Sequence, residues 1–227
     1  MLAVLKKELK SYFLSPIGYV VTGIFLICFS VLFVITIIGY GSVDLGVLYY
    51  YTAFYGLIII VPILTMRMFA EERKNGTEQL LLTSPIGMFN VVLGKLFAAL
   101  IVILITLLIS FMYFFIVMFL GKPNLLATLV SMLGFVLISM ATLSFGMFAS
   151  SLTENQIIAG IITVAFLIIS LFLPSISSGL SSLTLINYYV PFAQGILSFE
   201  NIIRLALFSV VFISLTIMIM QRRKMVK

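Results

Sequence analysis

The chain has 227 residues, of which 63% are hydrophobic and only 9% are charged, whereas a soluble domain usually carries about 25% charged residues. No water-soluble core buries so much apolar surface, so we expect an all-α integral membrane protein with residues 1–227 in a single transmembrane domain. The composition has no histidine and one cysteine, which excludes Ser-His catalysis, His-ligated metals and an internal disulfide; the formal charge of +6 indicates membrane orientation rather than nucleic-acid binding.

The N-terminal segment has helical spacing of apolar and basic side chains. Leu2 and Leu9 fall on one face, and Lys6 and Lys10 fall on the other. This pattern predicts a helix over residues 1–15 that lies in the membrane interface. A charged flank of the first crossing helix is the alternative interpretation.

Six apolar runs are long enough for crossing helices, which need about 20 residues each. The third helix could start as early as Pro85. Placing the N-terminus inside leaves only Lys122 and Arg204 outside, and eleven of the thirteen Lys and Arg residues inside. By the positive-inside rule, both termini are expected to be cytoplasmic. The expected spans are 17–40, 45–66, 96–120, 125–150, 156–173 and 202–220.

The stretch from Asn155 to Phe199 contains no charged residue and is too long for one crossing. A second full crossing would export the basic C-terminal tail. Pro174, Pro191 and Gly195 also interrupt regular helix. We therefore expect an external re-entrant helical hairpin after the fifth span, packed against other spans or a second subunit, because lipid cannot hydrogen-bond irregular backbone.

The expected spans hold no Asp, Glu, Lys or Arg away from their ends. Glu200 and Arg204, near the start of the last span, are spaced to pair with each other. Proton-driven transporters usually keep ionisable groups inside the bilayer. The chain also lacks a nucleotide-binding motif, so we expect no enzyme activity, no cofactor and no metal site in this chain. An ion-gradient-driven carrier or channel with no ATPase partner, and a structural membrane anchor, remain alternatives.

Residues 66–85 form a polar island that carries six of the twenty charges of the chain. Residues 67–74 can extend the second span as a helix, and residues 75–76, Asn-Gly, are a typical helix stop. Thr77 can then cap a short helix over 78–82. The pattern predicts a helix–break–helix elbow in water, whose leucines favour docking into a partner's groove. An ordinary inner loop is the alternative.

The island sequence MRMFAEERKNGTEQLLLTSP resembles the signature between the second and third spans of ABC-2-type transporter permeases. The segments KKELKSYFLSPIGYV and NYYVPFAQGI are similar to other parts of the same family, and the gliding-motility and nitrous-oxide-reductase-maturation type is the most similar. The resemblance covers essentially the whole chain. It implies the membrane subunit of an ATP-driven exporter in the cytoplasmic (inner) membrane of a prokaryote, paired with a second copy or a related permease.

The resemblance also assigns roles to segments. The elbow would be a cytoplasmic coupling helix that contacts a dimer of separate ABC ATPase subunits, which would bind ATP and magnesium. The external re-entrant helices would be Ser175–Leu197. The coupling role would fall to Arg67, Glu71, Glu72, Arg73, Gly76, Thr77 and Glu78.

The family has no fixed substrate signature, so the substrate path must be sought among polar side chains of the spans. The nearly uncharged interior favours an amphiphilic or hydrophobic cargo over a small free ion. The candidates for the substrate path are Thr22, Ser30, Thr36, Tyr55, Thr163 and Ser170.

Overall fold

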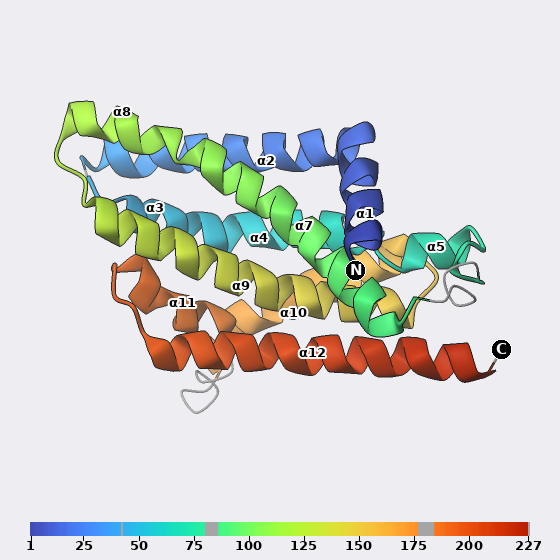
Figure 1. Ribbon diagram of the computed structural model, residues 1–227. Helices are drawn as coiled ribbons and strands as arrows, with labels where there is room; N and C mark the ends of the chain where they lie inside the picture. The colour runs from blue at the N-terminus through green and yellow to red at the C-terminus, as the bar shows by residue number, and fades with distance from the viewer. Residues whose placement is uncertain (42, 80–85, 177–183, 227) are drawn as a thin grey trace.

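The computed structural model describes residues 1–41, 43–79, 86–176 and 184–226. All regular elements in these ranges are helical, which confirms the all-α class. Most helices run side by side in one bundle, and α1 lies across one end of it (Figure 1). The elements are α1 (Leu2–Leu14), α2 (Pro16–Phe33), η1 (Val34–Gly39), α3 (Leu45–Tyr51), η2 (Thr52–Gly56), α4 (Leu57–Thr65), α5 (Ala70–Lys74), α7 (Met88–Ser110), α8 (Met112–Leu120), α9 (Leu125–Leu152), α10 (Gln156–Ile176), α11 (Leu185–Ala193) and α12 (Phe199–Val226).

Five helical stretches within the described residues are long and apolar enough to cross a membrane, as a multi-pass membrane protein requires. They coincide with the first four and the last of the six expected spans. The expected fifth span coincides with α10, whose apolar stretch, Gln156–Phe172, is shorter than the other five stretches. The five are Pro16–Gly39, Leu45–Lys74, Met88–Leu120, Leu125–Leu152 and Phe199–Met225.

The helix boundaries differ from the predicted ones in two places that matter below. The third span begins at Met88 rather than at residue 96, so Lys95 lies inside α7 instead of before it. The second span is interrupted by a turn at Met66–Phe69, so residues 67–74 do not continue it as one regular helix. Hydropathy ends a run at a charged residue, which explains the predicted start after Lys95, and it cannot register the break at Met66–Phe69, which accompanies hydrogen bonds to α9.

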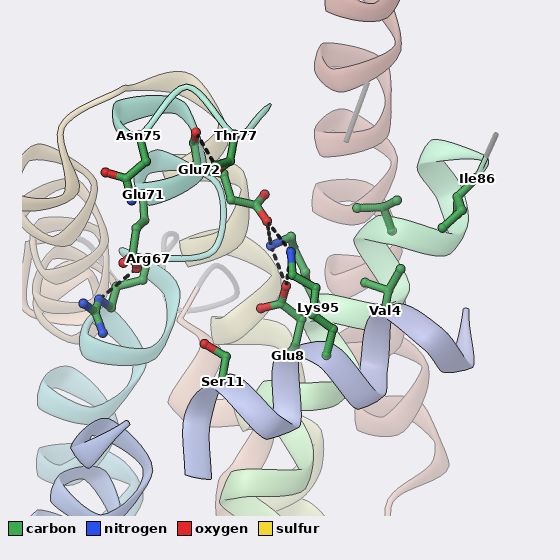
Figure 2. Close-up of a pocket in the computed structure, with 12 residues that line it drawn as sticks. Val4, Glu8, Ser11, Arg67, Glu71, Glu72, Asn75, Thr77, Ile86 and Lys95 are labelled. Carbon is green, nitrogen blue, oxygen red and sulfur yellow. Dashed lines mark hydrogen bonds and ion pairs between the residues drawn. The ribbon is translucent and has the colours of Figure 1, made fainter. Parts of the chain in front are cut away.

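Helix α1 packs across the start of α7 at the end of the bundle that also holds α5 and the C-terminus (Figures 1 and 2). The two helices approach closely because α7 has Gly94 at the crossing. A Cβ at that position would come within 3.0 Å of the Val4 side chain. Leu2 and Leu14 remain exposed on α1. The helix thus forms where the sequence predicts it.

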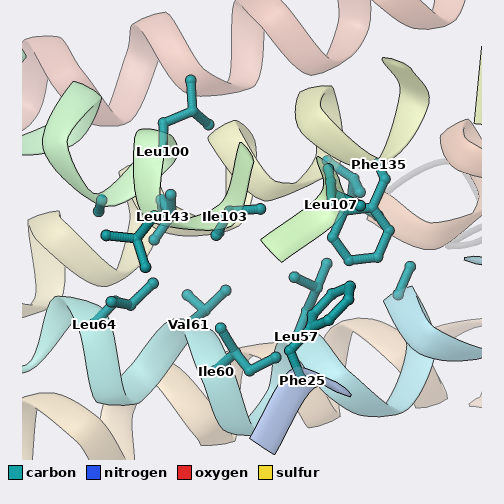
Figure 3. Close-up of a cluster of buried hydrophobic side chains, with 14 of the residues drawn as sticks. Phe25, Leu57, Ile60, Val61, Leu64, Leu100, Ile103, Leu107, Phe135 and Leu143 are labelled. Atoms are coloured by element: carbon teal, nitrogen blue, oxygen red, sulfur yellow. The ribbon is translucent and has the colours of Figure 1, made fainter. Parts of the chain in front are cut away.

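The core is built from buried side chains of helices along the whole chain, from α1 to α12. Helix α9 lies centrally and contacts α4, α7, α10, α11 and α12. Figure 3 shows Phe25 of α2, Leu57 and Ile60 of α4, Ile103 of α7 and Phe135 of α9 packed together. The rings of Phe25 and Phe135 meet edge to face, with centroids 5.7 Å apart. In a bilayer this packing acts mainly through van der Waals contact.

Only part of the predicted re-entrant hairpin, Ser175–Leu197, can be assessed, because residues 177–183 lie outside the described ranges. Its later half contains α11, a short helix that packs on α3 and α9. The Tyr189 hydroxyl donates to the backbone carbonyl of Ser131 on α9 at 3.1 Å, and Ser131 donates to the carbonyl of Phe192 at 3.0 Å. The described half is therefore held by buried hydrogen bonds.

Candidate functional site

At the turn Met66–Phe69, between α4 and α5, two backbone N–H groups bond to a side chain of another helix and not to backbone carbonyls of their own helix. The N–H groups of Phe69 and Ala70 both donate to the hydroxyl oxygen of Ser150 on α9, each at 3.1 Å. Ser150 is fully buried. Buried backbone groups must find partners, so Ser150 stabilises the break in the second span.

Tyr12 of α1 supports the same region from the other side. Its hydroxyl is buried and donates to the backbone carbonyl of Leu64, near the end of α4, at 3.2 Å. Burial, and then the nearby Glu8 carboxylate, raise the pKa of Tyr12 well above its usual value. The hydroxyl therefore stays protonated at neutral pH and remains a hydrogen-bond donor.

A buried ion cluster joins α5 to α1 and α7. The ammonium nitrogen Nζ of Lys95 on α7 lies 2.9 Å from Oε1 of Glu72 on α5 and 3.0 Å from Oε1 of Glu8 on α1 (Figure 2). Lys95 is only 2% exposed. Its ammonium also lies 5.3 Å from the centre of the Phe69 ring. We call Glu8, Glu72 and Lys95 the Lys95 triad; it connects three separate helices.

A second ion cluster holds the next part of the elbow against α9 and α12. Glu78 accepts from Arg73 and from Arg223 of α12, each at 3.3 Å. The guanidinium of Arg73 also donates to the backbone carbonyl of Ser151 at 2.9 Å. Glu78 is buried, whereas the Arg223 side chain is 29% exposed. The elbow is therefore fixed on two sides by different helices.

This burial corrects the prediction that the whole elbow lies in water. The side chains of Glu72, Arg73 and Glu78 are 14%, 10% and 9% exposed, because they pair with residues of other helices or of the elbow itself. Arg67 and Glu71 pair with each other at 3.0 Å and are each about one third exposed. The exposed tip consists of Lys74, Asn75, Gly76 and Thr77.

The tip has the helix stop that the sequence predicts. Gly76 has a φ of +72°, a left-handed conformation that favours glycine, and α5 ends at Lys74. The Thr77 hydroxyl donates to the backbone carbonyl of Glu72 at 3.2 Å. The predicted short helix over 78–82 lies partly outside the described residues.

A cavity of about 480 Å³ separates α1 from the elbow (Figure 2). Both signs of charge line it, including Lys7 and Glu8 from α1 and Arg67 and Glu71 from the elbow. Lys7 lies 3.5 Å from Glu72 and so extends the Lys95 triad toward the opening. The arrangement connects α1 to the elbow through charged side chains. No group of His, Cys, Asp or Glu suited to a metal ion occurs among the residues that the structure describes.

A comparison with known protein families gives a match for this chain. Residues 37–221 match the model of a family described as ABC-2 family transporter protein, which covers most of the chain and includes the elbow. The chain belongs to the ABC-2 transporter family. It is therefore a permease subunit of an ABC transporter, and such permeases generally associate with ABC ATPase subunits. A comparison with curated proteins gives no match.

The permease distributes the predicted substrate-path residues over several helices. Thr22 donates to the backbone carbonyl of Gly18 within α2, and Thr163 is buried and donates to that of Ala159 within α10. Ser30 forms hydrogen bonds on α2 and with the Tyr113 hydroxyl of α8. Each of these three hydroxyls therefore forms hydrogen bonds within the protein, and none of these bonds joins one of the three to another.

The remaining three candidates lie on α10, η1 and η2. Ser170 of α10 accepts from the backbone N–H of Leu185 at 3.4 Å. Thr36 of η1 and Tyr55 of η2 line one cavity of about 550 Å³ together with Tyr40 and Tyr51. Of the six candidates, the structure brings only Thr36 and Tyr55 together. The role of all six remains a prediction.

Sequence reasoning did not find four residues that hold the elbow: Glu8, Lys95, Ser150 and Arg223. Two of them carried a usable signal. Lys95 is the only charged residue between Glu78 and Lys122, and Glu8 is the only acidic residue before Asp44. A lone charge in an apolar surrounding needs a partner. Ser150 carried no such signal, since serines are common in this chain.

Proposed function

We propose that the permease is the membrane subunit of an ABC exporter that couples to two separate ATPase subunits through the exposed tip of its elbow, Lys74–Thr77. Membership of the ABC-2 family is the observation that carries this proposal. The tip is a fitting contact because it is the solvent-exposed part of a segment otherwise fixed to α1, α7, α9 and α12. ATP and magnesium would bind in the ATPase subunits, and this chain would hydrolyse nothing itself.

The charge distribution supports the orientation. The end of the bundle formed by α1, α5, the start of α7 and the end of α12 carries most of the basic residues, including Lys6, Lys10 and Arg222. The positive-inside rule then places this end, with both termini, in the cytoplasm. The membrane would be the cytoplasmic membrane of a prokaryote, with α10 as a sixth span and the segment around α11 as an external re-entrant element.

Transport requires a path between two membrane subunits. The second subunit would be another copy of the permease or a related one, and we propose that the permease is of the gliding-motility or nitrous-oxide-reductase-maturation type. Closure of the ATPase subunits on ATP would push the elbow and tilt the first, second and fifth spans. This would switch access from the inside to the outside, carrying a hydrophobic or amphiphilic cargo.

The test uses matched charge reversals at the two ends of the permease. Lys74→Glu alters the exposed tip of the elbow, and Lys122→Glu alters an exposed lysine at the opposite end. Both variants are co-expressed with an ABC ATPase subunit that co-purifies with the parent permease, and they are purified through a tag on the permease. We expect Lys74→Glu to lower ATPase recovery at least fivefold and Lys122→Glu to leave it unchanged. Equal recovery with both variants would contradict docking at the tip.

A further inference from the structure

The Lys95 triad is the one place where α1, the elbow and α7 share a single buried contact within the described residues. Lys95 bonds one carboxylate from a helix that begins the chain and one from a helix in the elbow. The donor Lys95 and the acceptor Glu8 lie 87 positions apart in the sequence. The triad therefore connects elements that the chain itself does not hold together.

Burial makes this connection hard to break. An exposed ion pair contributes little and weakens with salt, but a buried one is shielded from counter-ions. Separating it leaves a charge without its partner in a poorly solvated place, which strongly destabilises a folded protein. Displacing the elbow from α7 would separate Glu72 from Lys95 and leave it only the exposed Lys7 of α1, at 3.5 Å.

In the second ion cluster, breaking one contact does not leave a buried charge without a partner. Arg223 reaches Glu78 at 3.3 Å from a side chain that is 29% exposed, and Arg73 still neutralises Glu78 when Arg223 is absent. Losing the contact to α12 therefore strands no buried charge. The contacts of the elbow are therefore unequal: it is joined firmly to α1 and α7 through the triad and to α9 through Ser150 and the Ser151 carbonyl, and only weakly to α12.

We propose that Lys95 is a positioning residue that makes α1, the elbow and the start of α7 move as one body, while the contact with α12 yields. The rigidity of this unit follows from the geometry alone. Its use during transport rests on the proposed function, in which the ATPase subunits push the tip. A force on the tip would then rotate α1 and the inner end of α7 together.

The test needs a variant that removes the link without stranding a charge. Lys95→Met combined with Glu8→Gln and Glu72→Gln neutralises the whole triad and keeps side-chain size, so the fold is not burdened by an unpaired ion. Arg223→Gln is the matched control, because it also removes an ionic contact of the elbow. Thermal unfolding in detergent must show that both variants remain folded.

The first measurement uses the permease alone in lipid nanodiscs. Spin labels are placed on exposed positions of α1 and of the elbow through Lys6→Cys and Lys74→Cys, with Cys28→Ser to remove the native thiol. We expect a single narrow distance distribution in the parent and in Arg223→Gln, and at least a twofold broader one in the neutralised triad. An equally narrow distribution in the neutralised triad would overturn the proposal.

The second measurement uses the complex with the ATPase subunits. Labels at Lys6→Cys and Lys122→Cys report the movement of α1 against the far end of the bundle without touching the elbow. ATP should shift this distance in the parent and in Arg223→Gln, and the shift should be lost in the neutralised triad. No shift in the parent would refute the proposed function, whereas equal shifts in the parent and in the neutralised triad would refute only the role of Lys95.

Discussion

At the scale of single residues, two buried serine hydroxyls of α9, those of Ser144 and Ser150, have different consequences. Ser144 donates to the backbone carbonyl of Met140 in its own helix at 2.7 Å, so it adds little to what the helix already provides. Ser150 instead accepts from two N–H groups of another segment. Of the two, only Ser150 provides an acceptor for backbone N–H groups that would otherwise be unpaired in an apolar interior.

Ser150→Ala should therefore destabilise the permease. Removing the acceptor leaves the buried N–H groups of Phe69 and Ala70 without a partner, at a cost of about 1–3 kcal/mol each. Thermal unfolding in detergent measures the effect as a lowered midpoint. Ser144→Ala, a buried serine of the same helix, is the control and should change the midpoint little. Similar midpoints for the two variants would show that Ser150 does not hold the break.

Local rules predicted some residue-scale features and missed others. The stop at Gly76 and the pairing of Glu200 with Arg204 depend on neighbours in the sequence, and the structure has both. The contacts of Lys95 with Glu8 and of Glu78 with Arg223 join distant helices, so no local rule could place them. For this reason the sequence indicated an exposed elbow, whereas three of its six charged side chains, those of Glu72, Arg73 and Glu78, are largely buried.

At the scale of elements, close helix contacts depend on glycine. Gly146 of α9 lies against Thr65 of α4, and a Cβ at Gly146 would collide with the Thr65 side chain. Gly160 of α10 is also buried, but a Cβ there would meet only Met66, at ordinary contact distance. Small residues at helix crossings allow such approach in membranes.

Gly146→Ala should separate α4 from α9 and destabilise the bundle by about 1–3 kcal/mol, the usual cost of overpacking. Gly160→Ala should be neutral or stabilising by up to about 1 kcal/mol, because alanine is the better helix former. The midpoint of thermal unfolding distinguishes the two. A loss of stability in both variants would mean that helix packing tolerates no added methyl group, whatever the local space.

The spans were the most predictable elements and their interruptions the least. Apolar runs of sufficient length mark a crossing helix, because the bilayer requires every backbone group to be bonded within it. The turn at Met66–Phe69 and the π-helical segments η1 and η2 do not alter hydropathy. The turn depends on Ser150, which only the folded bundle brings close.

At the scale of the whole molecule, basic residues concentrate at one end of the bundle. The fold class and the order of the spans could be predicted from length, composition and charge. The relation of the permease to a second subunit could not, since the described surfaces of α2 and α12 expose many apolar side chains that suit either lipid or protein.

The orientation can be tested by labelling single cysteines in intact cells after Cys28→Ser. Lys122→Cys should react with a membrane-impermeant maleimide added outside, and Lys74→Cys should react only after the membrane is permeabilised. Mass-tag shifts on gels measure both reactions. Outside labelling of Lys74→Cys would contradict a cytoplasmic elbow and with it the proposed ATPase contact.

The Lys95 triad has a consequence for building hybrid permeases. Grafting residues 66–79 alone into a relative would carry Glu72 into a protein without its cation, and would leave Lys95 facing Glu8 alone in the donor. The smallest exchangeable cassette therefore spans three separate segments: α1, the elbow and the first two turns of α7. Exchanging partner preference between transporters would require moving these three together.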